Sequence, residues 1–180
     1  MRLSAIVGVG WMLMAPVAAD AHGGGLDASG CHNDRKAQSI HCHRQTHTGI
    51  PKVTDGDTIR IGKARIRLYG IDAPEAKQTC NVGDNEWRCG FEATNALANI
   101  IGENWVTCAR KDTDRYGRIV AVCRVGEIDL NAWMVGNGWA LAYRRFSLDY
   151  VADEIKAMRE KRGIWRGQFS PPWEWRRKKR

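Results

Sequence analysis

Two segments in which apolar and polar residues alternate, 53–61 and 64–71, constrain the fold of this chain most strongly. This alternation is typical of strands that bury one face. Gly62-Lys63 stands between the segments and predicts a two-residue hairpin turn. With that turn, Thr58 lies opposite Arg67, so the acidic segment around Thr58 comes within reach of the arginine.

A second hairpin is predicted from residues 105–109 and 118–125, joined through the Asp114-Arg115-Tyr116-Gly117 turn. Cys108 and Cys123 stand equally far from this turn, so they should face each other across the hairpin and form a disulfide.

Helix signals follow the strands. Residues 91–101 have an amphipathic pattern that ends at Gly102, and Asp129 can cap a second helix that runs toward Gly136 or Gly138. Residues 148–162 predict a third helix, with one apolar stripe formed by Val151, Ile155 and Met158. Strands first and helices later indicate an α+β domain, a small closed barrel with helices packed on it.

The chain divides into four predicted segments. Residues 1–21 resemble a signal peptide, because Arg2 precedes an apolar run to Ala19, and Ala19-Asp20-Ala21 supplies a small-x-small cleavage signal. The run is shorter than the about 20 residues that a membrane-spanning helix needs, so export to a periplasm or the medium is favoured over a membrane anchor. Residues 22–50 should be a flexible Cys/His-containing segment, 51–168 the folded domain, and 169–180 a tail rich in Trp and basic residues.

Export bears on the six cysteines, since an even count of cysteines in an oxidising environment indicates disulfides. Nearest-neighbour pairing joins Cys31 to Cys42, Cys80 to Cys89 and Cys108 to Cys123. The alternative for the first pair is a zinc or copper site, if the thiols stay reduced, together with three nearby histidines: His32, His41 and His43.

The net charge is +8, from 28 Lys and Arg against 20 Asp and Glu, and it favours a polyanionic partner such as nucleic acid. A solvated basic surface is the alternative. The tail offers the same choice: its basic run, 176–180, can contact phosphates, whereas Trp173 and Trp175 are expected to pack back on the barrel.

Five charged residues indicate a phosphate-cutting site: Asp57, Asp72, Glu75, Arg67 and Arg118. Carboxylates can hold a hard divalent cation, and guanidiniums can grip a phosphate and stabilise the charge that develops on it. Two of the acids follow a predicted strand only three residues apart, and the intervening proline stiffens the chain there.

Three motifs carry a family resemblance: Asp-Gly-Asp-Thr at 55–58, Arg-Leu-x-x-Ile-Asp-x-Pro-Glu at 67–75, and Asp-x-Tyr-Gly-Arg at 114–118. Together they resemble the staphylococcal nuclease family over residues 53–165. The resemblance implies a five-stranded OB-fold barrel with three helices. It also implies a monomeric, calcium-dependent enzyme that hydrolyses DNA and RNA and leaves 3′-phosphates.

The resemblance also implies residue roles. Asp57, Asp72 and the backbone carbonyl of Ala73 match calcium ligands, and Glu75 matches the residue that activates or positions the attacking water. Arg67 and Arg118 match the phosphate-binding arginines, and a pocket for the nucleotide is formed by Tyr143, Arg115 and Tyr116. Arg145 replaces a second pocket ring. The alternative is a non-catalytic nucleic-acid-binding module of the same fold.

Overall fold

The computed structural model describes residues 31–34, 39–42 and 46–179, and the predicted signal peptide lies outside them. The described residues fall into two units, one formed by residues 31–34 and 39–42 and the other by residues 46–179. In the first, β1 (Cys31–Asp34) pairs antiparallel with β2 (Ser39–Cys42), and the backbone register sets Cys31 opposite Cys42. Their side chains, and those of the neighbouring histidines, lie outside the described part of the chain. The disulfide and the alternative metal site therefore stay predictions.

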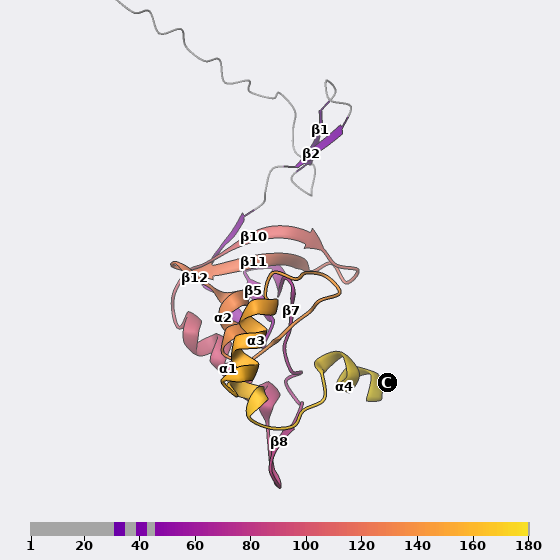
Figure 1. Ribbon diagram of the computed structural model, residues 1–180. Helices are drawn as coiled ribbons and strands as arrows, with labels where there is room; N and C mark the ends of the chain where they lie inside the picture. Colours follow the sequence, from indigo (N-terminus) through magenta and orange to yellow (C-terminus); the bar gives the residue numbers. More distant parts are fainter. Residues whose placement is uncertain (1–30, 35–38, 43–45, 180) are drawn as a thin grey trace, which may run out of the picture. The chain divides into compact units, whose positions relative to one another are not determined.

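The second unit is built on a curled, half-barrel sheet of seven strands (Figure 1). Its path is β3-β10-β11-β6-β5-β4, and β12 pairs with β11. The pairs are antiparallel except β11 with β6, which is parallel. The strands are β3 (Thr46–Gly49), β4 (Lys52–Asp55), β5 (Thr58–Ile61), β6 (Ala64–Leu68), β10 (Val106–Thr113), β11 (Ile119–Val125) and β12 (Ile128–Asp129). The predicted α+β, OB-like class is confirmed; β3 and β12 extend the predicted five strands.

Both predicted hairpin registers are confirmed. Thr58 pairs with Arg67, and Cys108 pairs with Cys123, with which it forms a disulfide. The prediction of one continuous strand over 53–61 was wrong, because the chain turns between β4 and β5 at Gly56-Asp57. A Cβ atom on Gly56 would lie 2.8 Å from Cβ of Ala73. Glycine at this position therefore allows the turn to pack closely against Ala73.

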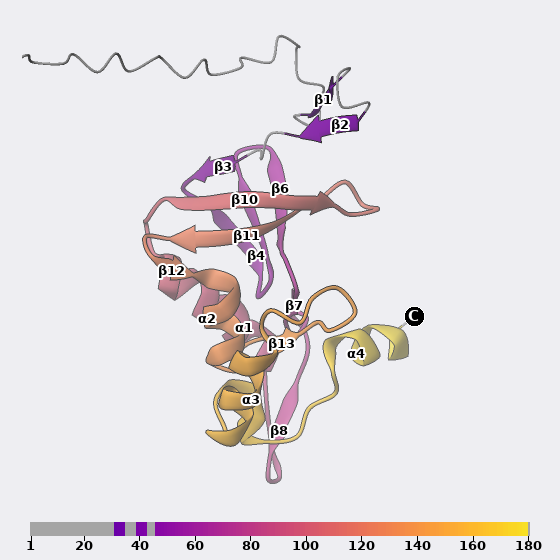
Figure 2. The ribbon, with the colours of Figure 1, turned by 45° about the horizontal axis from the view of Figure 1, so that its top comes forward.

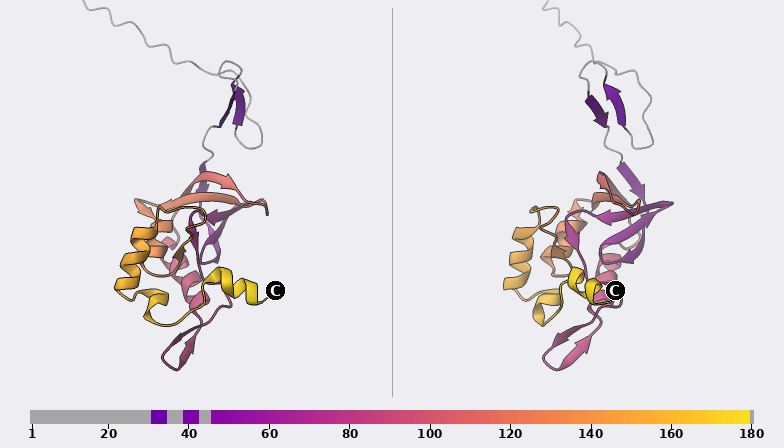
Figure 3. Two further views of the ribbon diagram at one scale, coloured as in Figure 1. Left: turned by 45° about the vertical axis from the view of Figure 1, so that its right-hand side comes forward. Right: turned by 90° about the vertical axis from the view of Figure 1, so that its right-hand side faces the viewer.

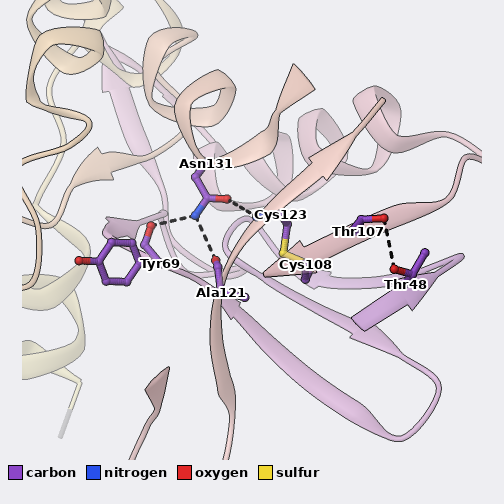
Figure 4. The surroundings of a disulfide bond; sticks show 7 residues. All are labelled: Thr48, Tyr69, Thr107, Cys108, Ala121, Cys123 and Asn131. Carbon is purple, nitrogen blue, oxygen red and sulfur yellow. Dashed lines mark hydrogen bonds between the residues drawn. A yellow bond between two sulfur atoms is a disulfide. The ribbon is translucent and has the colours of Figure 1, made fainter. Parts of the chain in front are cut away.

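A buried asparagine links the two hairpins beside the Cys108–Cys123 disulfide (Figure 4). Nδ2 of Asn131 donates to the carbonyl oxygens of Tyr69 and Ala121, at 2.9 and 3.3 Å, and its Oδ1 accepts from the amide of Cys123 at 3.1 Å. Asn131 is fully buried, so these bonds satisfy backbone groups that have no access to water there. The network fixes β11 against the end of β6.

The three predicted helices are present as α1 (Cys89–Ile101), α2 (Leu130–Gly136) and α3 (Val151–Arg159), grouped on one side of the sheet (Figure 2). Asp129 caps α2 through a hydrogen bond from the amide of Ala132, as predicted. The predicted apolar stripe of α3 was wrong at Met158, which is exposed. The helix buries Glu154 instead, because its carboxylate accepts from the amide of Ala142 and pairs with Arg144.

Short strand pairs complete the domain. β7 (Ile71–Asp72) pairs with β13 (Leu141–Ala142), and β8 (Cys80–Val82) forms with β9 (Asn85–Trp87) a hairpin that projects from the body (Figure 3). The predicted Cys80–Cys89 disulfide ties this hairpin to the start of α1. Among the described residues, no helix is long and apolar enough to cross a membrane. After the 3₁₀ turn at Gly163–Arg166, the tail forms an unpredicted helix, α4 (Pro172–Lys178).

Candidate active site

The ends of β6 and β7, the tip of the β10–β11 hairpin, the loop after β13 and α4 enclose a cleft of about 900 Å³. Six of the residues predicted for catalysis and substrate binding line it: Arg67, Glu75, Arg115, Tyr116, Arg118 and Tyr143. Segments more than 70 residues apart in the chain therefore meet in one hollow, as the site prediction requires.

Arg67 joins the two predicted metal-binding carboxylates. Its Nη1 atom lies 2.7 Å from Oδ1 of Asp57, and its Nη2 atom lies 2.8 Å from Oδ1 of Asp72. Both aspartates are buried, and Asp57 also accepts from the hydroxyl of Thr58 and the amide of Ala73. Buried charges need such partners, so this network fixes the positions of both carboxylates.

Asp57, Asp72 and Ala73 do not line the cleft themselves, and backbone contacts hold the two buried aspartates beside it. The amide of Leu68 donates to the carbonyl of Asp57 at 2.8 Å, which ties the β4–β5 turn to the end of β6. Asp72 is paired with Leu141 in the two-stranded β7–β13 ladder, and the amide of Tyr143 donates to the carbonyl of Gly70. The same ladder therefore brings the segment that carries Asp72 next to the segment that carries Tyr143.

Glu75 is held by a turn that packs against α1. The amide of Glu75 donates to Oε1 of Gln78, and the amide of Gln78 donates to the carbonyl of Glu75. A Cβ atom on Gly90 would lie only 1.7 Å from the carbonyl oxygen of Glu75. Glycine at this position of α1 therefore allows the turn to sit where the Glu75 side chain enters the cleft.

Arg118 lines the cleft but pairs with Asp114 rather than with the metal-site acids. Its Nε atom donates to Oδ2 of Asp114 at 2.7 Å, and its amide donates to Oδ1 at 3.0 Å. Although partial burial works against the charge, the hydrogen bonds from Arg118 and the amide of Tyr116 hold the pKa of Asp114 below its usual value. Asp114 at the hairpin tip therefore holds the guanidinium of Arg118 in place.

The predicted substrate pocket is aromatic and basic. Tyr143 is stacked on Trp173 of α4, with ring centroids 5.5 Å apart and planes at 7°, and Phe146 contacts it edge-on. The guanidinium of Arg115 lies over the ring of Tyr116 and donates to its hydroxyl. The expectation that Trp173 packs back on the domain is confirmed.

Arg176 of α4 is a member of the site that the sequence did not single out. Its Nη2 atom lies 2.7 Å from Oδ2 of Asp72, and its Nη1 atom lies 2.7 Å from Oε1 of Glu75 and 3.0 Å from Oδ1 of Asp72. Burial opposes its charge, but the carboxylates of Asp72 and Glu75 keep the pKa of Arg176 above its usual value. The only sequence signal was its place in the C-terminal basic run.

Burial changes the pKa values of two aspartates at the site, Asp55 and Asp72. Burial, followed by the neighbouring charge of Asp57, raises the pKa of Asp55 to about 7. Burial also raises the pKa of Asp72, against the guanidiniums of Arg176 and Arg67, which favour the charged form. Asp55 accepts from the amide of Asp57, so it supports the turn that carries the predicted ligand.

The carboxylate oxygens at this site supply some, but not all, of the ligands that a hard divalent cation needs. Asp57 and Asp72 offer buried carboxylate oxygens that share a counter-ion, and calcium takes oxygen ligands in a loose geometry. Within the described ranges, no three acidic, His or Cys side chains form a metal-holding group by themselves. An ion would therefore need the two carboxylates together with a carbonyl such as that of Ala73, and water or substrate oxygens.

The family model for "Staphylococcal nuclease homologue" matches residues 65–167, which include most of this cleft. The chain belongs to the staphylococcal nuclease homologue family. Asp57 and α4 lie outside the matched residues, so the family match covers neither that turn nor Arg176.

Several relatives of this staphylococcal nuclease homologue are similar over most of their length. An "Uncharacterized endonuclease" of Escherichia coli is 34% identical over 141 residues, which cover 74% of this chain and 86% of the relative. A "Micrococcal nuclease" of Shigella flexneri is 33% identical over 71% of this chain and 79% of its own length. A "Succinoglycan biosynthesis protein ExoI" of Rhizobium meliloti is 36% identical, covering 67% of this chain and 65% of the relative.

Proposed function

We propose that this protein is an exported, calcium-dependent nuclease that hydrolyses phosphodiester bonds of DNA and RNA. The observation that supports it most is the convergence of Arg67, Glu75 and Arg118 on one cleft beside the buried pair Asp57 and Asp72. The relatives from Escherichia coli and Shigella flexneri are named as an endonuclease and a nuclease, and the family description agrees with such an activity.

The guanidiniums are proposed to bind and polarise the scissile phosphate. A phosphodiester under attack gains negative charge on its non-bridging oxygens, and planar guanidiniums match two such oxygens better than a lysine does. Arg67 enters the cleft from β6 and Arg118 from the opposite hairpin tip, so the substrate phosphate would lie between them. Arg115 extends this basic wall toward the neighbouring nucleotide.

Glu75 is proposed to orient the attacking water and accept its proton. Its side chain is 35% exposed at the cleft, so water reaches it, and its backbone is fixed by Gln78 and by packing on Gly90. Asp57, Asp72 and the Ala73 carbonyl would hold calcium. When bound, the ion would polarise the phosphate and acidify or orient water. By family resemblance the products end in 3′-phosphates.

Digestion of single-stranded DNA and RNA by the purified protein tests this function, first with calcium and then with excess chelator. We expect cleavage only with calcium. Arg118→Ala should lower the rate by about 100-fold, because a donor to the transition state is removed. Arg124→Ala is the matched control, since this exposed arginine lies near the other end of β11, the strand that Arg118 directly precedes, and outside the cleft. Binding of nucleic acid without any cleavage in calcium would instead support the non-catalytic alternative.

Export is proposed on compartment grounds. The disulfides Cys80–Cys89 and Cys108–Cys123 suit an oxidising environment, in agreement with the signal-like residues 1–21. Fractionation of cells that produce the full chain, followed by mass determination of the N-terminus, tests this. Recovery of the uncleaved chain with reduced cysteines from the cytosol would contradict it.

A further inference from the structure

The guanidinium of Arg176 occupies oxygen atoms that the proposed calcium site needs. Oδ2 of Asp72 accepts from Nη2 of Arg176 at 2.7 Å, and Oδ1 accepts from Arg176 at 3.0 Å and from Arg67 at 2.8 Å. Oε1 of Glu75 accepts from Arg176 at 2.7 Å. Both oxygens of the proposed ligand Asp72 are thus engaged by arginine.

A divalent cation competes with Arg176 for these oxygens. Calcium binds carboxylate oxygens at roughly 2.3–2.6 Å, so it would need the lone pairs that now accept hydrogen bonds, and it would repel the guanidinium beside it. Three carboxylates, of Asp57, Asp72 and Glu75, are contacted by two guanidiniums, which leaves one negative charge. Without Arg176 two negative charges remain, which a divalent ion neutralises.

The position of α4 keeps Arg176 close to the site. The base of the helix is fixed where Nε2 of the buried Gln78 donates to the carbonyl of Ser170 at 2.7 Å. One turn before Arg176, Trp173 stacks on Tyr143 and packs against a small core that includes Leu141 and Ile164. Beyond Arg176 the helix is exposed and ends at Lys178.

The Arg176 side chain itself is the weakly buried part of this arrangement. It remains 33% exposed, whereas the Asp72 side chain that it contacts is fully buried. An arginine at the rim can leave by rotation of its own side chain or by movement of the last turn of α4, while the aspartate stays in place. In Figure 2, α4 lies at the edge of the domain, away from the group formed by α1, α2 and α3.

We propose that Arg176 is a built-in competitor of the catalytic cation: it pairs with Asp72 and Glu75 in the cation-free protein and must leave before calcium binds there. The inference rests on the proposed calcium site. It predicts that part of the calcium binding energy is used to displace Arg176, so the parent protein binds calcium more weakly than its carboxylates alone would.

Isothermal titration of the full chain with calcium, without nucleic acid, tests this competition. Arg176→Ala should bind calcium about tenfold more tightly than the parent, because the competent state is no longer masked. Arg177→Ala is the matched control: it removes the same charge from the next position of α4, where the side chain is 75% exposed and faces Glu174. Its affinity should stay close to that of the parent, and thermal unfolding of each variant verifies the fold.

Hydrogen–deuterium exchange supplies a second readout. In the parent, calcium should speed exchange of the peptide that covers 172–178, and in Arg176→Ala exchange there should be fast with or without calcium. If Arg176→Ala binds calcium no more tightly than the parent, Arg176 is only a structural clasp and the inference is overturned, while the proposed calcium site stands. If neither protein binds calcium, the calcium site itself is wrong and the inference falls with it.

Discussion

The Nε atom of Arg118 donates to Oδ2 of Asp114 across the tip of the β10–β11 hairpin, at 2.7 Å. The pair lies four residues apart, and the amide of Arg118 donates to the same carboxylate, so backbone and side chain are fixed together. The hairpin tip therefore presents the guanidinium to the cleft in a defined orientation, and Asp114 is a positioning residue for it.

The first prediction concerns that orientation. Asp114→Asn keeps one acceptor oxygen but removes the charge that holds the guanidinium, so nuclease activity should fall by about tenfold. The loss should appear mainly in kcat with a smaller change in KM. Steady-state cleavage of single-stranded DNA measures it. Unchanged kcat would show that Arg118 needs no anchor.

The second prediction concerns pH. Partial burial opposes the charge of Asp114, but hydrogen bonds from Arg118 lower the pKa of this carboxyl below its ordinary value of 3.8. A lowered folded pKa contributes stability that is present above the unfolded pKa and lost as pH falls through the folded one. Asp114→Asn should therefore unfold at a lower temperature than the parent at neutral pH, and the difference should shrink below about pH 4. A difference that is constant across this range would contradict the assignment.

The third prediction concerns Arg67. A lysine ammonium cannot bridge Asp57 and Asp72 as the fork of Arg67 does, and it cannot offer two parallel donors to a phosphate. Arg67→Lys should lower the cleavage rate by about 100-fold and the free energy of unfolding by about 1–3 kcal/mol. Arg60→Lys, at an exposed position of β5, is the control and should change neither quantity. Full activity of Arg67→Lys would remove Arg67 from the catalytic set.

The fourth prediction concerns the disulfide beside Asn131. Cys108 and Cys123 close a loop with a sequence separation of 15, which in the chain-entropy model stabilises the fold by about 3 kcal/mol. The double variant Cys108→Ala/Cys123→Ala should lose about that much free energy of unfolding in a urea titration. Equal stability of the variant and the oxidised parent would show that the β10–β11 register needs no covalent support.

The elements that local signals specify were predictable. Alternation and the turn at Gly62-Lys63 set Thr58 opposite Arg67, and equal spacing from the second turn set Cys108 opposite Cys123; the structure has both pairs. The N-cap of α2 at Asp129 was also predictable, because the capping hydrogen bond spans only three residues. The cleft residues followed from motifs whose order along the chain is enough to identify them.

The parts that depend on tertiary contacts were not predictable. The helix α4 has seven residues and no amphipathic repeat that a sequence pattern would reveal. Its place depends on the Gln78–Ser170 bond and on the stacking of Trp173 with Tyr143, which join distant segments. The presence of Arg176 in the site was therefore not predictable from the sequence. The burial of Glu154 and the exposure of Met158 have a similar cause, since the partners of Glu154, Ala142 and Arg144, lie outside α3.

The single-turnover rate of DNA cleavage by Glu75→Gln in saturating calcium tests the central claim most directly. The substitution keeps the size of the side chain and one acceptor oxygen but removes the base, so the rate should fall by about 10²–10³-fold. Exposed Glu86→Gln on β9 is the control and should match the parent. If Glu75→Gln folds normally and cuts DNA as fast as the parent, the assignment of this cleft as the catalytic site is contradicted.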